Sequence, residues 1–298
     1  MIHENCELSG NAAENPIAVS IQSLWRWAVK QLMPVSTTPN LDAELLLATC
    51  LGLTRAQLYS QPRFATLSAQ HQQFIQALVE RRQAGEPIAY LLGQQEFWSL
   101  LLEVNSSVLI PRPETELLVE QVLANMSNEE KKIADLGTGS GAIALALATE
   151  RPAWQFVATD YSNDALQLAE RNRQRYNLKN IELRQGDWCN AFYREEYFDV
   201  IASNPPYLAS NDPHFQSEWS LSFEPKSALI AGENGLQHLE TIIRQSRCYL
   251  VAGGVLFLEH GYAQATLVKQ FFLNYGYHTL LQHKDLAGHK RVTSGKWH

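Results

Sequence analysis

The sequence predicts an α/β protein in which a mostly parallel sheet, covered by helices on both faces, follows a small helical domain. From residue 131 onward, short apolar runs alternate with segments of helical periodicity, the pattern of a parallel sheet with helices on both sides. Residues 16–88 show helical periodicity alone. The 298 residues, 45% of them hydrophobic, are enough for two globular domains.

The N-terminal region divides into a tail and a helical bundle. Residues 1–15 are polar, and we expect a mobile tail there because they lack the basic and apolar regions of a signal peptide. In the segment 21–32, Leu24, Trp27, Ala28 and Leu32 share one helical face. Segments 41–53 and 68–87 show the same periodicity, so residues 16–88 are predicted to form a bundle. The residues leave open whether this bundle only packs or docks a partner.

A β-hairpin linker is predicted over residues 89–113. Two apolar stretches flank Asn105-Ser106-Ser107, which are turn-forming residues. Pro113 suits the first position of the next helix, and the acidic Glu114 and Glu116 suit the positive end of its dipole. Residues 114–298 then form the α/β domain, with strands expected at 131–136, 154–160, 181–187, 198–204 and 254–261 and helices at 142–150, 163–176 and 235–250.

The residues that follow each strand are the candidate ligand-binding residues, because ligands of such sheets lie at the carboxyl ends of the strands. The first strand leads into "DLGTGSG", residues 135–141, whose alternating glycines allow a ligand to approach the backbone. Its spacing is neither that of a dinucleotide fingerprint nor that of a P-loop. A tight turn alone would also explain it.

Acidic and aromatic residues follow the next two strands. Asp160 lies about twenty residues beyond the glycine loop, where an acid can accept both hydroxyls of a ribose, although it could instead cap the next helix. Asp187 could accept from an exocyclic amine, and Trp188 could lie against a flat base. The alternative for this pair is a solvated turn beside a core tryptophan. Together with the loop, these residues predict a nucleoside cofactor.

The fourth strand runs into Asn204-Pro205-Pro206-Tyr207, which cannot continue a ladder because neither proline has an N–H. The Asn204 side-chain oxygen and the Pro205 carbonyl are two acceptors held in a rigid segment, and they could bind both hydrogens of a planar NH2 group. The ring of Tyr207 could stack on that plane. We therefore assign catalysis to Asn204, Pro205 and Tyr207, and substrate binding to Asn204, Pro205, Pro206 and Tyr207.

These motifs resemble those of class I S-adenosylmethionine-dependent methyltransferases. Within that class, the sequence is similar to the release factor glutamine methyltransferases, also called HemK or PrmC. The similarity covers about residues 20 to 298 and rests on the following stretches: "RRQAGEPIAYLLGQQEF" (81–97), "VLIPRPETE" (108–116), "ADLGTGSGAIALALA" (134–148), "SNPPY" (203–207), "FEPKSAL" (223–229) and "LEHG" (258–261).

The resemblance implies a Rossmann-like, mostly parallel sheet of seven strands that transfers a methyl group from S-adenosylmethionine, leaving S-adenosylhomocysteine. The acceptor it implies is the N5 amide nitrogen of the glutamine in the GGQ motif of class 1 peptide chain release factors. It also favours docking of this substrate on the helical bundle. The family's cofactor residues correspond here to Gly137, Gly139, Gly141, Asp160, Trp188 and Asn204. We also predict that Thr138, Ser140 and Asp187 bind the cofactor.

Composition limits the remaining possibilities. The four cysteines are widely spaced and form no CxxC pair, so neither a disulfide framework nor a zinc site is expected, and a cytoplasmic location fits. No metal site and no membrane span are expected. The net charge of −7 suits a protein substrate better than stable binding of nucleic acid. We expect a monomer.

Two rival functions share the motifs. A nucleic-acid adenine methyltransferase would use the same asparagine, but would also need a basic cleft or a recognition domain to hold a flipped base. A regulator that binds the cofactor without turnover would be expected to have lost part of the glycine loop or of residues 204–207, and both are intact.

Six further residues have open roles. Arg112 and Glu114 could orient the substrate backbone or only fasten the linker, and Phe97 could line the pocket or the hairpin core. Arg291 is expected to be structural. Glu259, with its neighbour His260, suggests an acid–base pair, but a packed strand end is the simpler interpretation.

Overall fold

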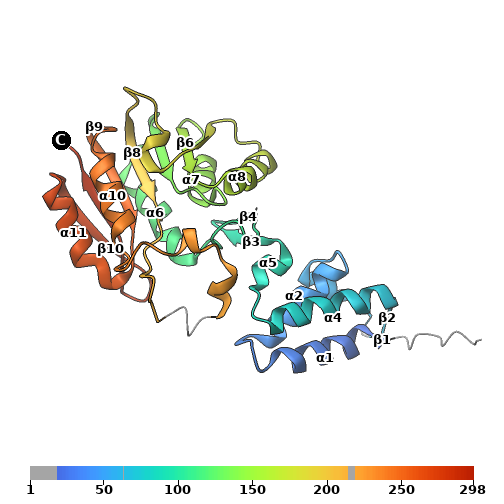
Figure 1. The fold of residues 1–298 in the computed structure, drawn as a ribbon. Coiled ribbons are helices and arrows are strands. Elements are labelled where there is room, and N and C mark those ends of the chain that lie inside the picture. The colour runs from blue at the N-terminus through green and yellow to red at the C-terminus, as the bar shows by residue number, and fades with distance from the viewer. Residues whose placement is uncertain (1–18, 63, 214–218) are drawn as a thin grey trace, which may run out of the picture. The chain divides into compact units, whose positions relative to one another are not determined.

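The computed structural model describes residues 19–62, 64–213 and 219–298, and it divides into two compact units at Gly85 and Glu86 (Figure 1). The predicted tail, residues 1–15, lies outside the described residues. Each unit has its own arrangement of secondary structure.

The first unit is a helical bundle, as the periodicity predicted. Its helices are α1 (Ile21–Leu32), α2 (Pro39–Cys50), α3 (Arg55–Ser60) and α4 (Ala69–Gln83). Helix α1 buries Leu24, Ala28 and Leu32 along one face, and the Ser20 side chain caps its first turn. The unit is not entirely helical, however, since β1 (Val19–Ser20) pairs antiparallel with β2 (Thr66–Leu67). Strands of two residues are too short to show an alternating pattern in the sequence.

The second unit begins with α5 (Ile88–Leu92) and a hairpin of β3 (Gln94–Phe97) and β4 (Leu100–Glu103). The hairpin itself was predicted, but its turn was misplaced. The two turn residues are Trp98 and Ser99, both with positive φ, of 51° and 60°. Neither is a residue type that usually adopts this conformation, so the turn carries no signal in the sequence. The predicted turn at 105–107 lies after β4.

The main sheet has seven strands in the order β10-β11-β9-β8-β5-β6-β7. Five are parallel, while β11 runs antiparallel to β9 and β10 antiparallel to β11. The mostly parallel seven-stranded sheet is therefore confirmed. The strands are β5 (Lys132–Leu136), β6 (Gln155–Asp160), β7 (Ile181–Gln185), β8 (Phe198–Ser203), β9 (Leu250–Glu259), β10 (His278–Lys284) and β11 (Lys290–Lys296).

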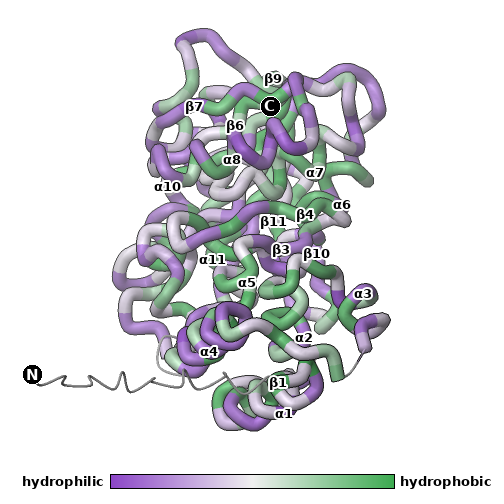
Figure 2. Tube along the Cα trace, turned by 90° about the vertical axis from the view of Figure 1, so that its right-hand side faces the viewer, coloured by the Kyte–Doolittle hydropathy of each residue, from purple (hydrophilic) through white to green (hydrophobic). Residues whose placement is uncertain are grey.

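Helices cover both faces of this sheet. On one side lie α6 (Glu116–Asn125), α7 (Ala142–Glu150) and α8 (Asn163–Arg175), and on the other α10 (Gln237–Ser246) and α11 (Ala265–Asn274) (Figure 1). Because both faces are covered, β5 and β8 are buried almost throughout. Helix α7 buries its first seven residues, and its segment is mostly hydrophobic in Figure 2.

The order of the strands determines where a site can form. The chain runs outward from β5 to β6 and β7, and then returns to place β8 on the other side of β5. The helices that connect to these two strands consequently diverge, which opens a crevice at the carboxyl ends of β5 and β8. Leu136 and Ser203 are register partners at these ends, so Gly137 and Asn204 follow side by side.

Candidate functional site

Four residues at the carboxyl ends of neighbouring strands lie in a row across the sheet. Leu136 of β5 pairs with Thr159 of β6 and with Ser203 of β8, and Ser203 pairs with Leu258 of β9. The next residue along each strand gives the row Asp160, Gly137, Asn204 and Glu259. Pairing between strands thus brings together residues that lie far apart in the sequence.

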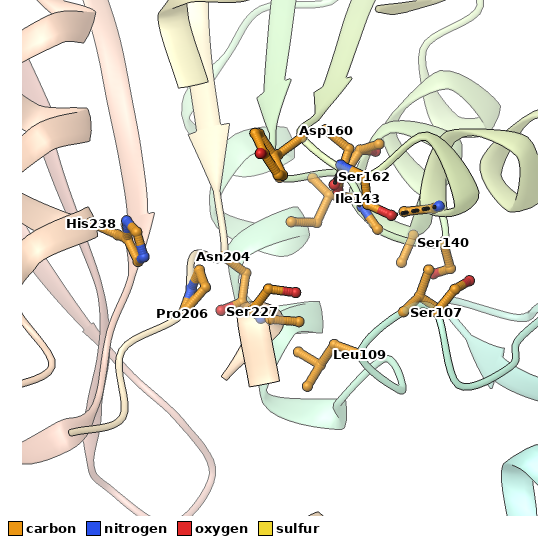
Figure 3. A pocket seen from close by; sticks show the side chains of 18 of the residues that line it. Ser107, Leu109, Ser140, Ile143, Asp160, Ser162, Asn204, Pro206, Ser227 and His238 are labelled. Atoms are coloured by element: carbon orange, nitrogen blue, oxygen red, sulfur yellow. Dashed lines mark hydrogen bonds between the residues drawn. The ribbon is translucent and has the colours of Figure 1, made fainter. Parts of the chain in front are cut away.

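The glycine loop is braced by the acid beside it. The backbone N–H of Gly139 donates to Asp160 Oδ2 at 2.9 Å, and that of Ser162 donates to Asp160 Oδ1 at 2.9 Å. Ser162, not Asp160, caps α8 by accepting from Ala165 N. Burial raises the pKa of Asp160, although these backbone hydrogen bonds act against the increase. Its carboxylate faces the cavity in Figure 3.

A second acidic residue, Asp135, also supports the glycine loop. Thr138 Oγ1 donates to Asp135 Oδ2 at 2.7 Å, and the N–H of Ala144 reaches the same oxygen at 3.2 Å. Burial raises the pKa of Asp135 to about 7. Its other oxygen has no hydrogen-bond partner among the described residues. Asp135 therefore fixes the loop to the start of α7, a role that the sequence analysis did not assign.

Trp188 packs against the backbone of Gly137. A Cβ atom at Gly137, whose φ is +71°, would lie 3.2 Å from Trp188 Cζ3. The Trp188 ring also lies near the His238 ring, with the ring centroids 5.2 Å apart. Burial lowers the pKa of His238, which favours a neutral imidazole at the cavity wall. Asp187, just before the tryptophan, is exposed at the cavity edge.

These residues enclose a cavity of about 280 Å³ (Figure 3). Every predicted cofactor residue except Gly141 lines it. Gly141, with a φ of +88°, lies at the N-cap of α7, where a Cβ atom would meet Leu145 Cδ1 at 2.5 Å. Gly141 therefore allows close packing at the start of helix α7 and does not line the cavity. The lining also includes residues that the sequence analysis missed: Ser107, Leu109, Ile143, Ser227, Ile230 and His238.

A second cavity, of about 450 Å³, adjoins the first. Pro205 and Tyr207 line this second cavity, while Asn204 and Pro206 line both. Asn204 therefore stands where the two cavities meet. Its Nδ2 donates to Thr115 Oγ1 at 2.9 Å, and its buried Oδ1 has no hydrogen-bond partner within the described part of the chain.

The segment after Asn204 is held rigidly. Gln264 Nε2 donates to the Tyr207 carbonyl at 2.9 Å and to the Gly235 carbonyl at 3.0 Å. Leu208 forms a bridge with Ile230, donating to the Leu229 carbonyl at 2.9 Å. Burial raises the pKa of the Tyr207 hydroxyl, so the ring is neutral near pH 7.

Charged side chains line the second cavity around Glu259. Burial raises the pKa of Glu259 to about 7, whereas a hydrogen bond from Thr115 and the charge of Arg291 lower it. Arg291 also pairs with Asp285 at 3.0 Å. His260 does not pair with Glu259. It contacts Thr293 Oγ1 at 2.8 Å and the Gly261 carbonyl at 3.0 Å, and burial lowers its pKa to about 4. The two residues are a packed strand end, as the simpler interpretation held.

Contacts indicate roles for two of the open residues. Arg112 forms an ion pair with the buried Glu224, which also accepts from Ile110 N at 3.0 Å, so these contacts fasten the linker to the segment around residue 224. Arg112 also lines both cavities. Phe97 is 1% exposed and belongs to the main core of the sheet.

The donor set of the first cavity suits a nucleoside cofactor. It offers a backbone that can be approached closely at Gly139, a carboxylate at Asp160 and an aromatic ring at Trp188. The described residues contain no group of three or more His, Cys, Asp or Glu side chains that could hold a metal ion. In the same part of the chain, no helix has the length and apolarity needed to cross a bilayer.

Comparison of the sequence with known proteins shows the family to which the chain is related. Residues 23–93 match the family model described as the PrmC N-terminal domain, and residues 113–232 match the methyltransferase small domain. The chain is 48% identical to the release factor glutamine methyltransferase of Coxiella burnetii, an alignment that covers 92% of this chain and 98% of that protein. It is 45% identical to the enzyme of the same name from Escherichia coli strain K12, with coverages of 92% and 97%.

Similarity to a solved structure supports the fold of this chain, but not its function. The 16S rRNA N2 G1207 methyltransferase of Thermus thermophilus, in complex with AdoMet and guanosine, superposes with a TM-score of 0.52 at 18% identity. The alignment covers 69% of this chain and 50% of that one. The seven-stranded sheet of the second unit is therefore an arrangement that methyltransferases use.

Proposed function

The chain belongs to the release factor glutamine methyltransferase family, and from that premise we propose how its two cavities methylate a glutamine amide. The first cavity holds S-adenosylmethionine and the second receives the glutamine side chain. The observation that carries this assignment is the position of Asn204, which lines both cavities and has a buried side-chain oxygen with no hydrogen-bond partner among the residues described.

Residues at the ends of β5, β6 and β7 bind the cofactor. The Asp160 carboxylate accepts from the ribose hydroxyls, Trp188 lies against the adenine, and the glycine loop allows close approach of the remainder. Thr138 and Ser140 shape this loop, and Asp187 accepts from the exocyclic amine. When bound, the cofactor supplies an electrophilic methyl group.

Residues 204–207 bind and orient the amide. Asn204 Oδ1 and the Pro205 carbonyl each accept one hydrogen of the glutamine NH2 group, and the Tyr207 ring stacks on the amide plane. Two accepted hydrogen bonds return electron density to a nitrogen whose lone pair is otherwise delocalised into its carbonyl. Holding this nitrogen next to the cofactor cavity supplies the proximity that the reaction needs. One N–H proton leaves to solvent as the methyl group takes its place, so no strong general base is required.

The partner we propose is a class 1 peptide chain release factor that presents the glutamine of its GGQ loop. The helical bundle of the first unit serves as a docking surface for this protein. We further propose that the chain acts as a monomer in the cytoplasm and does not bind nucleic acid stably. The net charge of −7 and the widely spaced cysteines support these assignments.

The experiment that tests the function is mass spectrometry of an unmethylated release factor after incubation with the protein and S-adenosylmethionine. We expect one added methyl group on the GGQ glutamine, and no addition with Asn204→Ala. Methyl transfer to DNA or RNA in a parallel reaction, without transfer to the release factor, would contradict the proposed substrate. Binding of S-adenosylmethionine with no transfer to any acceptor would indicate a regulator.

A further inference from the structure

We propose that Arg291 binds a main-chain carbonyl of the acceptor polypeptide beside the target glutamine, an inference that rests on the proposed function of the second cavity. Arg291 is the second residue of β11, and it lines the second cavity but not the first. The next residue, Val292, pairs with Glu259 at the end of β9, and the Arg291 carbonyl accepts from His260 N at 2.9 Å. Arg291 therefore lies at the edge of the sheet where residues 204–207 also lie.

Two contacts hold the guanidinium of Arg291. Its Nε donates to Asp285 Oδ2 at 3.0 Å, and Asp285 Oδ1 accepts from His289 N at 2.8 Å, so the carboxylate is itself fixed. The guanidinium also lies 5.5 Å from the ring centroid of Tyr262, within the range of about 6 Å for a cation–π interaction. A group held in this way loses little freedom when it binds a ligand.

These contacts leave the terminal nitrogens of Arg291 available to a ligand. A guanidinium carries five N–H groups, one on Nε and four on Nη1 and Nη2. Among the described residues, the hydrogen bond from Nε to Asp285 is the one that the Arg291 side chain forms. Arg112, which also lines the second cavity, instead uses its terminal Nη2 to pair with the buried Glu224. Arg291 is thus the arginine of this cavity that keeps both terminal nitrogens for a bound molecule.

The position of Arg291 selects the part of the substrate that it meets. Asn204 and Pro206 line both cavities and mark the point where the glutamine amide faces the cofactor. Arg291 lines only the second cavity, so its partner is a group away from the reacting nitrogen. The second cavity, at about 450 Å³, has the size of pockets that bind drug-sized molecules, which measure about 300–1,000 Å³. It therefore has room for main chain beside the glutamine as well as for the glutamine side chain.

The chemistry of the cavity selects a carbonyl as this partner. A guanidinium only donates, so its ligand must supply an accepting oxygen. An acidic side chain of the substrate would meet the carboxyls of Glu114 and Asp212, which line the same cavity, and like charges repel. A neutral main-chain carbonyl meets no such repulsion, and every residue of a polypeptide has one. Arg291 therefore recognises the acceptor as a polypeptide, while residues 204–207 recognise the amide.

Kinetics with the release factor as acceptor test the inference. A hydrogen bond away from the reacting amide is equally strong before and during methyl transfer, so its loss raises KM and leaves kcat unchanged. In Arg291→Met, which keeps an aliphatic stem and removes the guanidinium, we expect the KM for the release factor to rise about 10- to 100-fold. The kcat should stay within about threefold of the wild type, and the affinity for S-adenosylmethionine within about twofold.

Two further variants separate substrate binding from a structural role. Arg171→Met is the matched control: Glu103 holds this guanidinium at Nε, at 2.9 Å, but Arg171 lines neither cavity, so KM should stay within about twofold. Asp285→Ala breaks the same ion pair as Arg291→Met but keeps the guanidinium, so KM should rise only about threefold. If Arg291 only closed the turn between β10 and β11, Asp285→Ala and Arg291→Met would raise KM equally, and that result would overturn the proposal.

Other outcomes of these assays also decide the proposal. A KM of Arg291→Met within about twofold of the wild type would overturn it, as would a loss of S-adenosylmethionine affinity as large as the rise in KM. If Arg291→Met does not fold, Arg291→Lys carries the test, because it keeps the charge beside Asp285 and removes the planar fork. Its KM should rise at least about fivefold, and an unchanged KM would overturn the proposal.

A change in the acceptor identifies the carbonyl without turnover. Semisynthetic release factors carry an ester in place of the peptide bond on one or the other side of the GGQ glutamine, and an ester carbonyl is the weaker acceptor. In calorimetry with protein bound to S-adenosylhomocysteine, one of the two esters should weaken binding to the wild type at least about threefold and leave binding to Arg291→Met unchanged. Equal effects on both proteins would overturn the main-chain contact. A wild type that neither binds nor methylates the unaltered release factor would instead contradict the proposed function.

Discussion

Asn172 is the buried polar residue whose replacement we expect to have the largest effect outside the cavities. It lies on α8 and is completely buried. Its Oδ1 accepts from Glu103 N at 2.7 Å, and its Nδ2 donates to the Glu103 carbonyl at 3.0 Å and to the Ser140 carbonyl at 2.9 Å. One side chain thus joins the hairpin strand β4 to the glycine loop.

The stability lost in Asn172→Ala depends on whether its hydrogen-bond partners can bond to water instead. The two backbone groups of Glu103 belong to a half-buried residue and can regain water, so each loss costs about 1 kcal/mol. Ser140 is 2% exposed, so its carbonyl would remain unpaired at a cost of about 1–3 kcal/mol. The sum is about 3–5 kcal/mol, which for a unit of this size lowers Tm by about 10 °C.

Chemical and thermal denaturation of Asn172→Ala measure this loss, with Arg175→Ala, an exposed position near the end of the same helix, as the control. The control should change the free energy of unfolding by no more than about 0.5 kcal/mol. Calorimetry should also show weaker S-adenosylmethionine binding by Asn172→Ala, because the Ser140 carbonyl no longer holds the loop. A destabilisation below about 1 kcal/mol would refute the reasoning, since it would mean that the three hydrogen bonds are replaced by water.

Three other predictions follow from the site. Asp160→Ala should weaken S-adenosylmethionine binding about 100-fold in calorimetry, because two hydrogen bonds to a charged acceptor are lost; a change below about threefold would argue against the ribose assignment. Gly137→Ala should lower cofactor affinity about tenfold, since its φ of +71° disfavours a side chain and the new Cβ would press on Trp188; unchanged affinity in the same titration would contradict it. The pKa of Glu259 is raised to about 7 by burial, so its contribution to stability is fully present below pH 4.5 and is lost as the pH rises to about 7. Glu259→Gln should remove this loss, which is about 3 kcal/mol, so the stability of the variant relative to the wild type should increase between pH 5 and pH 7 in denaturation curves; a pH-independent difference would show that the folded-state pKa is not raised.

The sequence predicted the structure well where a periodic pattern of apolar residues is followed directly by residues with a recognisable binding chemistry. The alternation from residue 131 predicted the strands of the sheet to within a few residues, apart from the early start of β9 and the two final strands. The glycine loop, Asp160, Trp188 and Asn204 were identifiable because each lies at or just after the carboxyl end of a strand, and parallel strands bring these ends to one edge of the sheet. The hairpin turn at Trp98 and Ser99 was missed because neither residue type usually adopts a positive φ.

The sequence by itself determined the family and the parallel sheet, and it predicted the chemistry of residues 204–207, because these depend on residue types at short spacing. Only the tertiary structure decided which side chains contact and support the site residues. Asn204 and Thr115 are 89 positions apart, and Asn172 reaches Ser140 across 32. Glu259 lies beside Asn204 only because β9 pairs with β8 in one register. A hydrogen bond over such separations leaves no periodic signal in the chain, since strand pairing and helix packing set its geometry.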